Sequence, residues 1–267
     1  MSLSQDFAVA DLVHRLRDAR AVAVLTGAGA SAESGLRTFR GVTVGAEPLP
    51  SDMAALWKDF DPASLATPEA FERDPAMVSR WYDWRRLGCL AAQPNPGHLA
   101  LAALEKAITA RGGRFWLLTQ NVDRLHQRAG STRVIELHGN IIEWRCTRSG
   151  EHTTPPATPM ESYPMPTKAG GVLRPDVVWF GEMLPERALM DAQEAAESCD
   201  VFITAGTSSQ VYPAAGFVSV AASHGAYTAE INAERTPVSG RVNCSILGRT
   251  GEILPRVVSG ITDLLGR

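Results

Sequence analysis

The segment from Val22 to Gly41, VAVLTGAGASAESGLRTFRG, places the strongest constraint on the fold of this chain. Its apolar start is typical of a buried parallel strand, and Gly27, Gly29 and Ala32 follow in the G-x-G-x-x-A spacing of a dinucleotide-binding turn. We expect Gly27 to adopt a positive φ at the corner, and the bare backbone at Gly29 to let a pyrophosphate approach the helix N-terminus. An ordinary tight turn between a strand and a helix is the alternative interpretation.

The chain after this motif differs from a redox-type Rossmann unit. In such a unit the helix leads to a second strand that ends in an acidic residue about 20 positions later. Here Thr38-Phe39-Arg40-Gly41 leads into a region with Pro, Gly and Trp that predicts no strand. The sequence therefore disfavours a redox dehydrogenase and predicts a nucleotide covered by a polar loop.

Length and composition indicate a globular protein with one large domain and a smaller appendage. The 267 residues are near the upper limit for a single core, and the net charge of -3 gives no electrostatic reason to expect nucleic acid or an anionic membrane as a partner. The N-terminus lacks a signal-peptide pattern, and the longest apolar stretch, residues 214–222, is too short to span a bilayer. Cys89, Cys146, Cys199 and Cys244 form no C-x-x-C pair, which argues against a disulfide framework and a Cys₄ metal site. We expect a cytoplasmic protein.

Apolar periodicity predicts an α/β fold with a doubly wound parallel, Rossmann-like sheet. Strands are expected at 22–26, 115–119, 134–137, 201–204 and 228–231, and helices at 75–90, 99–110, 123–128, 185–197 and 214–224, with further helices at the two ends. A helical insertion separates the first two strands, and a Pro- and Thr-rich run between Arg145 and Gly171 predicts an irregular excursion. In such sheets, sites lie at the carboxyl ends of strands.

Polar clusters follow four of the predicted strands. They comprise Gln120, Asn121 and Asp123; His138 and Asn140; Gly206, Thr207, Ser208 and Ser209; and Asn232 and Glu234. Each has a structural alternative, since Asp123 could be a helix N-cap and His138 a surface or core histidine. Their joint placement at one edge of the sheet indicates a nucleotide site with a general base.

Six segments in register carry a family resemblance: GAGASAESGLRTFRG, TQNVDRLHQRAG, ELHGN, LRPDVVWFGE, GTSSQVYPAAGF and EINAE. The chain resembles the sirtuins, NAD-dependent protein deacylases, over nearly its whole length, and most closely the bacterial branch of their desuccinylase-like class III. The resemblance implies NAD as a consumed co-substrate and acyl-lysine proteins as substrates.

The resemblance also implies which residues bind NAD. These are Gly27, Ala28, Gly29, Ser31, Ala32, Phe39 and Arg40 in the first motif; Gln120, Asn121 and Asp123 at the nicotinamide ribose; Gly206, Thr207, Ser208, Asn232 and Glu234 at the adenosine half; and Thr250. It further implies that the NAD-binding domain comprises 1–40, 94–140 and 172–267, and the small domain 41–93 and 141–171.

The implied chemistry assigns catalytic roles to His138 and Asn121. The acyl-lysine amide oxygen attacks C1′ of the nicotinamide ribose, nicotinamide leaves, and His138 accepts a proton from a ribose hydroxyl. The products are free lysine, nicotinamide and 2′-O-acyl-ADP-ribose. A protein ADP-ribosyltransferase and a non-catalytic NAD sensor are the alternatives, and neither needs His138 as a base in this way.

Substrate recognition is implied for two segments. Val177, Val178, Trp179, Phe180 and Gly181 would pair with an extended peptide, like a strand added to a sheet edge. Tyr82 and Arg85 share a face of the predicted helix 75–90, where they would meet the terminal carboxylate of succinyl- or malonyl-lysine. The alternative is that Trp81, Tyr82 and Trp84 are core aromatics while Arg85 and Arg86 are solvated.

The structural zinc that relatives usually carry is not expected here. Between the His-Gly segment and LRPDVVWFGE the chain offers only Cys146, with Ser149 in place of a C-x-x-C partner, and His152 cannot complete four ligands. We expect no zinc and a small domain held by Trp144, Tyr163 and prolines instead.

Overall fold

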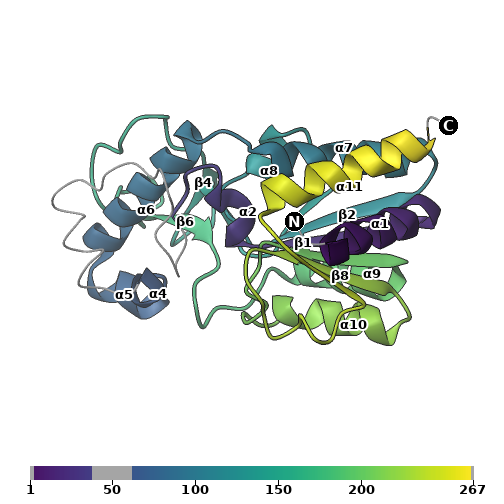
Figure 1. Ribbon diagram of the computed structural model, residues 1–267. Helices are drawn as coiled ribbons and strands as arrows, with labels where there is room; N and C mark the ends of the chain where they lie inside the picture. The colour runs from purple at the N-terminus through teal and green to yellow at the C-terminus, as the bar shows by residue number, and fades with distance from the viewer. Residues whose placement is uncertain (1–2, 38–61, 266–267) are drawn as a thin grey trace.

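The computed structural model describes residues 3–37 and 62–265 and contains a large parallel sheet (Figure 1). Its strand order is β3-β2-β1-β7-β8-β9, and each neighbouring pair is parallel. The strands are β1 (Ala21–Thr26), β2 (Arg114–Thr119), β3 (Val134–Glu136), β7 (Val201–Ala205), β8 (Tyr227–Asn232) and β9 (Cys244–Leu247). The order reverses between β1 and β7, which confirms a doubly wound, Rossmann-like α/β fold.

Helices cover both faces of this sheet (Figure 1). One face packs against α1 (Leu3–Asp18), α7 (Pro96–Ala110) and α11 (Thr250–Leu265), and the other against α9 (Glu186–Ser198), the 3₁₀ turn η1 (Ala214–Gly216) and α10 (Phe217–Ser223). Side chains of a strand alternate between faces, so Val22 and Val24 join the first apolar cluster while Ala23 and Leu25 join the second. This explains why β1 is an unbroken apolar run.

The turn between β1 and the short helix α2 (Ala28–Ala32) packs directly on the end of β7. Gly27 has a φ of -131°, so the predicted positive φ is wrong. Glycine is required there because a Cβ at Gly27 would lie 2.7 Å from Cβ of Thr207, and one at Gly29 would lie 2.8 Å from the Gly206 carbonyl oxygen. The positive φ belongs to Gly206, at 62°.

A small module stands beside the sheet (Figure 1). It contains α4 (Pro62–Leu65), α5 (Pro68–Arg73), α6 (Pro75–Ala91) and an antiparallel sheet β5-β4-β6, formed by β4 (Gly139–Cys146), β5 (His152–Thr153) and β6 (Leu173–Val177). Its apolar cluster joins Trp81 and Tyr82 of α6 to Trp144 of β4 and to Trp179. The sequence predicted the helix at 75–90 but only an irregular excursion in place of the antiparallel sheet, because its strands flank a polar insert.

Other boundaries also differ from the sequence-based expectations. β9 was not predicted, and α7 begins at Pro96 because Asn95 caps it. The helix α8 (Leu125–Arg128) is shorter than expected at its start. Thr67 followed by Pro68 is the sequence pattern of an N-cap with Pro at the first helical position, and Thr67 does cap α5 by accepting from the Ala70 amide at 3.1 Å. Among the helices in the described ranges, none has both the length and the apolarity to cross a membrane.

Replacing Gly206 by Ala should destabilise the protein more than replacing Gly225. Both glycines have a positive φ, but a Cβ at Gly206 would lie 2.4 Å from the Ala30 nitrogen, whereas one at Gly225 meets nothing within 4 Å. We expect Gly225→Ala to lower the free energy of unfolding by about 1 kcal/mol and Gly206→Ala by about 2–4 kcal/mol, because overpacking adds to the strain. Denaturant unfolding measures both, and equal losses would contradict the close contact.

Candidate functional site

The predicted site residues in the described part of the chain mostly lie at the carboxyl ends of the large sheet. Gln120 follows β2 and donates from Nε2 to Oγ1 of Thr207, which follows β7, at 2.9 Å. The Gly29 amide donates to the Gly206 carbonyl at 2.7 Å, so this amide is already bonded within the chain. A pyrophosphate that approaches this backbone would therefore find no free amide at Gly29. Ala28 and Gly29 are nevertheless exposed, whereas Phe39 and Arg40 lie outside the described residues.

Three predicted residues form one buried hydrogen-bond network. Asn121 donates from Nδ2 to the Gly27 carbonyl and to Oγ of Ser31, both at 3.0 Å. Ser31 in turn donates to Oδ2 of Asp123 at 2.7 Å. Oδ1 of Asp123 accepts from the Leu125 amide at 2.8 Å, although the N-cap of α8 is Arg124 and not Asp123. These side chains therefore hold the β1–α2 turn against the loop after β2.

Burial is the main influence on the Asp123 carboxyl group. It raises the pKa of Asp123, and the hydrogen bonds from the Leu125 amide and Ser31 oppose that rise. The group consequently depends on these donors to remain ionised. Any loss of the Ser31 hydroxyl would remove one of them.

Two buried histidines beneath this network were not predicted. Nδ1 of His98 accepts from the Asn95 amide at 3.3 Å, so its Nε2 carries the proton and faces Oγ of Ser31 at 3.3 Å. Nε2 of His126 lies 2.9 Å from Oγ1 of Thr26, and the two rings are 4.7 Å apart. Burial lowers the pKa of His98 to about 4 and that of His126 to about 3, so both stay neutral at pH 7.

The run Pro-Asn-Pro-Gly-His at residues 94–98 carried a signal for this arrangement. Asn before Pro is a typical N-cap followed by Pro at the first helical position. Asn95 caps α7 in a capping box with His98, and its Nδ2 also donates to the Ala30 carbonyl at 2.8 Å. The cap therefore ties α7 to α2, which only the tertiary structure could reveal.

His138 is held in the form that can accept a proton. Its Nδ1 lies 3.1 Å from the Gln120 carbonyl oxygen, and because a carbonyl only accepts, Nδ1 must carry the hydrogen. Nε2 then keeps its lone pair. Burial lowers the pKa of His138, only partly offset by the bond to Gln120, so the ring is neutral at pH 7. This arrangement fits a general base.

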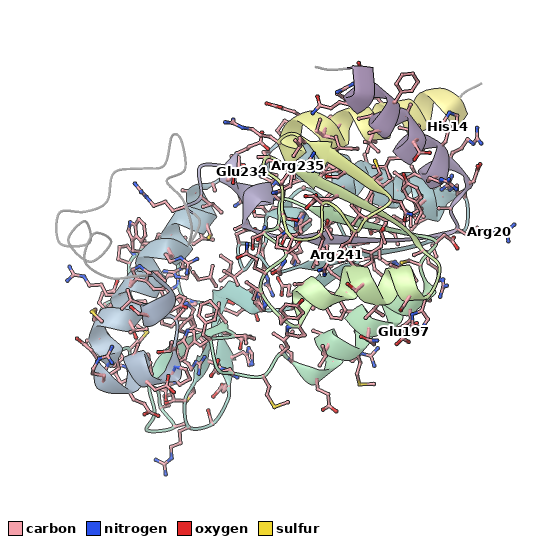
Figure 2. All side chains as sticks on the ribbon, turned by 60° about the horizontal axis from the view of Figure 1, so that its bottom comes forward. His14, Arg20, Glu197, Glu234, Arg235 and Arg241 are labelled. Carbon is pink, nitrogen blue, oxygen red and sulfur yellow. The ribbon has the colours of Figure 1, made fainter. Side chains whose placement is uncertain are left out.

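Some of the polar groups predicted to bind NAD after β8 and at the start of α11 already form hydrogen bonds within the chain. Asn232 donates from Nδ2 to the Glu234 carbonyl at 2.8 Å, and Glu234 itself is exposed on the loop after β8 (Figure 2). Ser208 is partly buried beside Thr207. Thr250 is 2% exposed and donates to Glu33 at 3.3 Å, so its hydroxyl is used within the chain. A cofactor role for these residues stays a prediction.

The segment expected to pair with a peptide is not an open strand edge. β6 ends at Val177, and the Val178, Trp179 and Phe180 amides donate to the His138 carbonyl (2.9 Å), Oε2 of Glu182 (2.8 Å) and the Ala66 carbonyl (2.9 Å). A peptide strand would thus have to use other groups, such as the Gly181 amide and carbonyl oxygens. The bond from Val178 also couples this segment directly to His138.

Tyr82 and Arg85 lie near each other on α6, next to this segment, although the Arg85 guanidinium carbon is closer to the Trp81 ring centroid, at 4.7 Å. The Arg85 guanidinium carbon lies 5.6 Å from the Tyr82 ring centroid, and the Tyr82 and Trp179 rings are 6.2 Å apart. Tyr82 is 2% exposed, and burial raises its pKa to about 12, so its hydroxyl remains a donor at neutral pH. Trp81 and Tyr82 both belong to the buried apolar cluster and Trp84 packs against it, as the alternative interpretation held, but solvation of Arg86 is wrong because Arg86 is fully buried.

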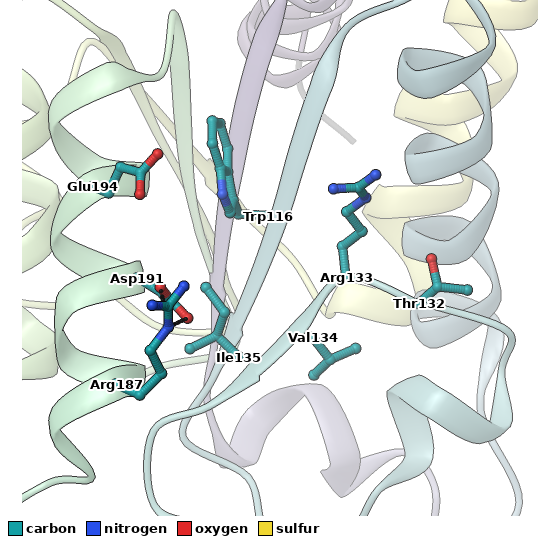
Figure 3. A pocket seen from close by; sticks show the side chains of 8 residues that line it. All are labelled: Trp116, Thr132, Arg133, Val134, Ile135, Arg187, Asp191 and Glu194. Atoms are coloured by element: carbon teal, nitrogen blue, oxygen red, sulfur yellow. Dashed lines mark hydrogen bonds and ion pairs between the residues drawn. The ribbon is translucent and has the colours of Figure 1, made fainter.

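A separate hollow of about 430 Å³ lies along the sheet edge beside β3 (Figure 3). Its lining comprises Trp116, Thr132, Arg133, Val134, Ile135, Arg187, Asp191 and Glu194. Arg187 is already paired with Asp191 at 3.0 Å. The hollow shares no residue with the predicted site, and we do not place the nucleotide there because such ligands bind at the carboxyl ends of strands.

Comparisons with known proteins agree with this geometry. The model of the Sir2 family matches residues 27–213. NAD-dependent protein deacylase 2 of Pyrobaculum aerophilum is 47% identical over 253 residues, which cover 95% of this chain and 94% of that protein. A solved Sir2 homologue in complex with NAD is 40% identical with a TM-score of 0.85, covering 96% of this chain and 94% of its own. A mutant Sir2 homologue bound to 2′-O-acetyl ADP ribose is 39% identical with a TM-score of 0.85, covering 96% and 98%. The chain belongs to the Sir2 family.

Proposed function

We propose that this protein is an NAD-dependent protein-lysine deacylase that prefers acidic acyl groups such as succinyl and malonyl. The observation that carries the proposal is His138, whose Nδ1 is bonded to the Gln120 carbonyl and whose Nε2 lone pair is therefore available. The His138 ring bonds to Gln120, the neighbour of Asn121 in the buried network, and the His138 backbone carbonyl accepts from Val178 in the segment after β6. A binding protein without catalysis would gain nothing from such a base.

NAD would be held by the exposed backbone at Ala28 and Gly29 and by the loops after β2, β7 and β8. When bound, NAD would supply an activated C1′ for attack by the acyl oxygen, with nicotinamide as the leaving group. The chain's own contribution is orientation and proton transfer. The rigid Ser31–Asn121–Asp123 network fixes the loops around the ribose, and His138 accepts a proton at Nε2.

Tyr82 and Arg85 support the preference for acidic acyl groups. A protonated phenol and a guanidinium beside each other suit a carboxylate, because both donate hydrogen bonds and the guanidinium also adds a positive charge. Trp179 packs beside Tyr82, which gives the aliphatic part of an acyl chain an apolar wall. An acetyl group would contact the same apolar wall but has no carboxylate to pair with the Arg85 guanidinium. We therefore expect deacetylation to be retained at a lower rate.

His138→Ala should reduce turnover by about 10²-fold or more while leaving NAD affinity nearly unchanged, because the mutation removes the base and leaves the buried network in place. Steady-state deacylation and calorimetric titration with NAD measure the two effects. The matched control is His14→Ala, at an exposed histidine far from the site, which should change neither turnover nor NAD affinity. Near-normal turnover of the His138 variant would contradict the assigned role.

The pH profile should report a depressed histidine pKa. Burial lowers the pKa of His138 below its ordinary 6.5, so the neutral base is present above that lowered value and is lost as the pH falls through it. We expect kcat/KM to be flat near neutral pH and to fall on the acid side with a midpoint below 6.5. A midpoint clearly above that value would show that another group limits the rate.

Arg85→Met should lower kcat/KM for a succinyl peptide by about 10- to 150-fold and spare the acetyl peptide, since a charged hydrogen bond contributes about 1.5–3 kcal/mol. Tyr82→Phe, which keeps the buried ring, should have a smaller effect in the same direction. Arg80→Met, an exposed arginine on the same helix, is the matched control. If both activities fall together in the Arg85 variant, Arg85 supports the fold and the acidic preference is wrong.

A further inference from the structure

The insert between β4 and β6 contains two turns of the same kind. In the first, Cys146 and Ser149 are followed by Gly150 at a φ of 72°. In the second, Pro166 and Ala169 occupy the equivalent places before Gly170 at 82°. The two turns lie together, since Thr147 and Val172 exchange hydrogen bonds, from the Thr147 amide at 2.9 Å and from the Val172 amide to Thr147 Oγ1 at 3.1 Å.

This arrangement has the spacing of a four-ligand zinc site but not its chemistry. Residues 150–165, a run of 16, separate the two turns, so the equivalent positions read C-x₂-S-x₁₆-P-x₂-A, against C-x₂-C-x₁₅₋₂₀-C-x₂-C for zinc sites. Pro166 and Ala169 have no side-chain donor, and a hydroxyl such as that of Ser149 is not among the usual ligands. The residues present do not fit zinc.

The Cys146 thiol instead forms a hydrogen-bonded link between the turns. Its Sγ lies 3.0 Å from Oγ1 of Thr167 in the second turn. It also accepts from the Arg148 and Ser149 amides, each at 3.4 Å. The Cys146 sulfur, which would coordinate the metal in a zinc site, is thus hydrogen-bonded by protein groups instead.

A fully buried ion pair on α6 fastens the rest of the insert. Arg86 donates from Nη2 and Nε to Oδ1 of Asp83, at 2.6 and 2.8 Å. The same guanidinium donates to the Pro156 carbonyl at 2.7 Å and to the Thr158 carbonyl at 3.0 Å. Oδ2 of Asp83 accepts from the Met160 amide at 2.9 Å and from the Tyr163 hydroxyl at 2.5 Å. Both charged side chains therefore bind the insert as well as each other.

We propose that this protein replaces the structural zinc of its family with the Asp83–Arg86 pair, which ties the metal-free insert to α6. The pair can do this because each partner has its remaining donors or acceptors satisfied by the insert, as a buried ion pair requires. Tyr82 and Arg85 lie on the same helix beside the pair, so the link also positions them. The structural replacement itself does not depend on the proposed activity.

A second group of possible ligands does not supply an alternative metal site. Glu143, His152 and Asp176 have ligand atoms within 4.8 Å of one another. Each carboxylate, however, already faces an arginine, with Arg124 Nη1 2.8 Å from Glu143 and Arg145 Nε 3.6 Å from Asp176. A cation would have to compete with both guanidinium groups.

The proposal is tested first by metal content. Protein expressed with added zinc and purified without chelator should contain only traces of zinc, and chelator should leave its unfolding midpoint unchanged. A variant with Ser149→Cys, Pro166→Cys and Ala169→Cys, which completes four thiolates with Cys146, should bind about one zinc ion per chain. Near-stoichiometric zinc in the native protein, or a midpoint that falls with chelator, would overturn the proposal.

The role of the ion pair is tested by limited proteolysis of the insert. Arg86→Met leaves the Asp83 carboxylate buried without its partner, so tryptic cleavage after Arg148 and Lys168 should become much faster than in native protein or in the Arg80→Met control. Zinc bound by the three-cysteine variant should slow cleavage again in the Arg86→Met background. If the Arg86→Lys and Arg86→Met proteins are both cleaved at the native rate, the Asp83–Arg86 pair does not hold the insert on α6.

Discussion

The structure depends most on the close approach of two backbone turns, one after β1 and one after β7. Gly27 and Gly29 contact Thr207 and Gly206 at distances that leave no space for side chains. The amides of both glycines donate across this contact, to Ala205 at 3.2 Å and to Gly206 at 2.7 Å. The strand order reverses here, and doubly wound sheets bind their ligands at such a reversal. The contact therefore lies at the base of the expected ligand site.

Buried polar groups connect this contact to His138, the proposed general base. Ser31 accepts from Asn121, faces His98 and donates to Asp123, so one hydroxyl connects α2, α7 and the loop after β2. Neutral histidines suit this position because a charged ring would be costly without a counter-ion. The Gln120 backbone then orients His138, and the His138 carbonyl accepts from Val178. Hydrogen bonds and the intervening backbone thus link the turn between β1 and α2 to the segment after β6.

Features with local causes were predictable from the sequence. The apolar run of β1, the Thr67 cap and the polar residues after β2, β3 and β7 follow from periodicity and turn chemistry. Features that need a distant partner were not. The sequence could not show that Gly206 rather than Gly27 takes the positive φ, because that depends on how β7 meets α2. Burial of Arg86 was missed for the same reason: its partner carbonyls, Pro156 and Thr158, lie about 70 residues away in a segment with no periodic pattern.

The most direct test of the central claim follows the two halves of NAD in one reaction. NAD labelled in the nicotinamide half or, separately, in the adenosine half is incubated with the protein alone and with a succinyl-lysine peptide. The label is then measured in free nicotinamide, in ADP-ribose products and on protein. We expect nicotinamide release only with the peptide, and all of the transferred adenosine label in 2′-O-acyl-ADP-ribose. Label attached to protein, or nicotinamide release that does not depend on the acyl peptide, would contradict deacylation and favour ADP-ribosyl transfer or simple NAD hydrolysis.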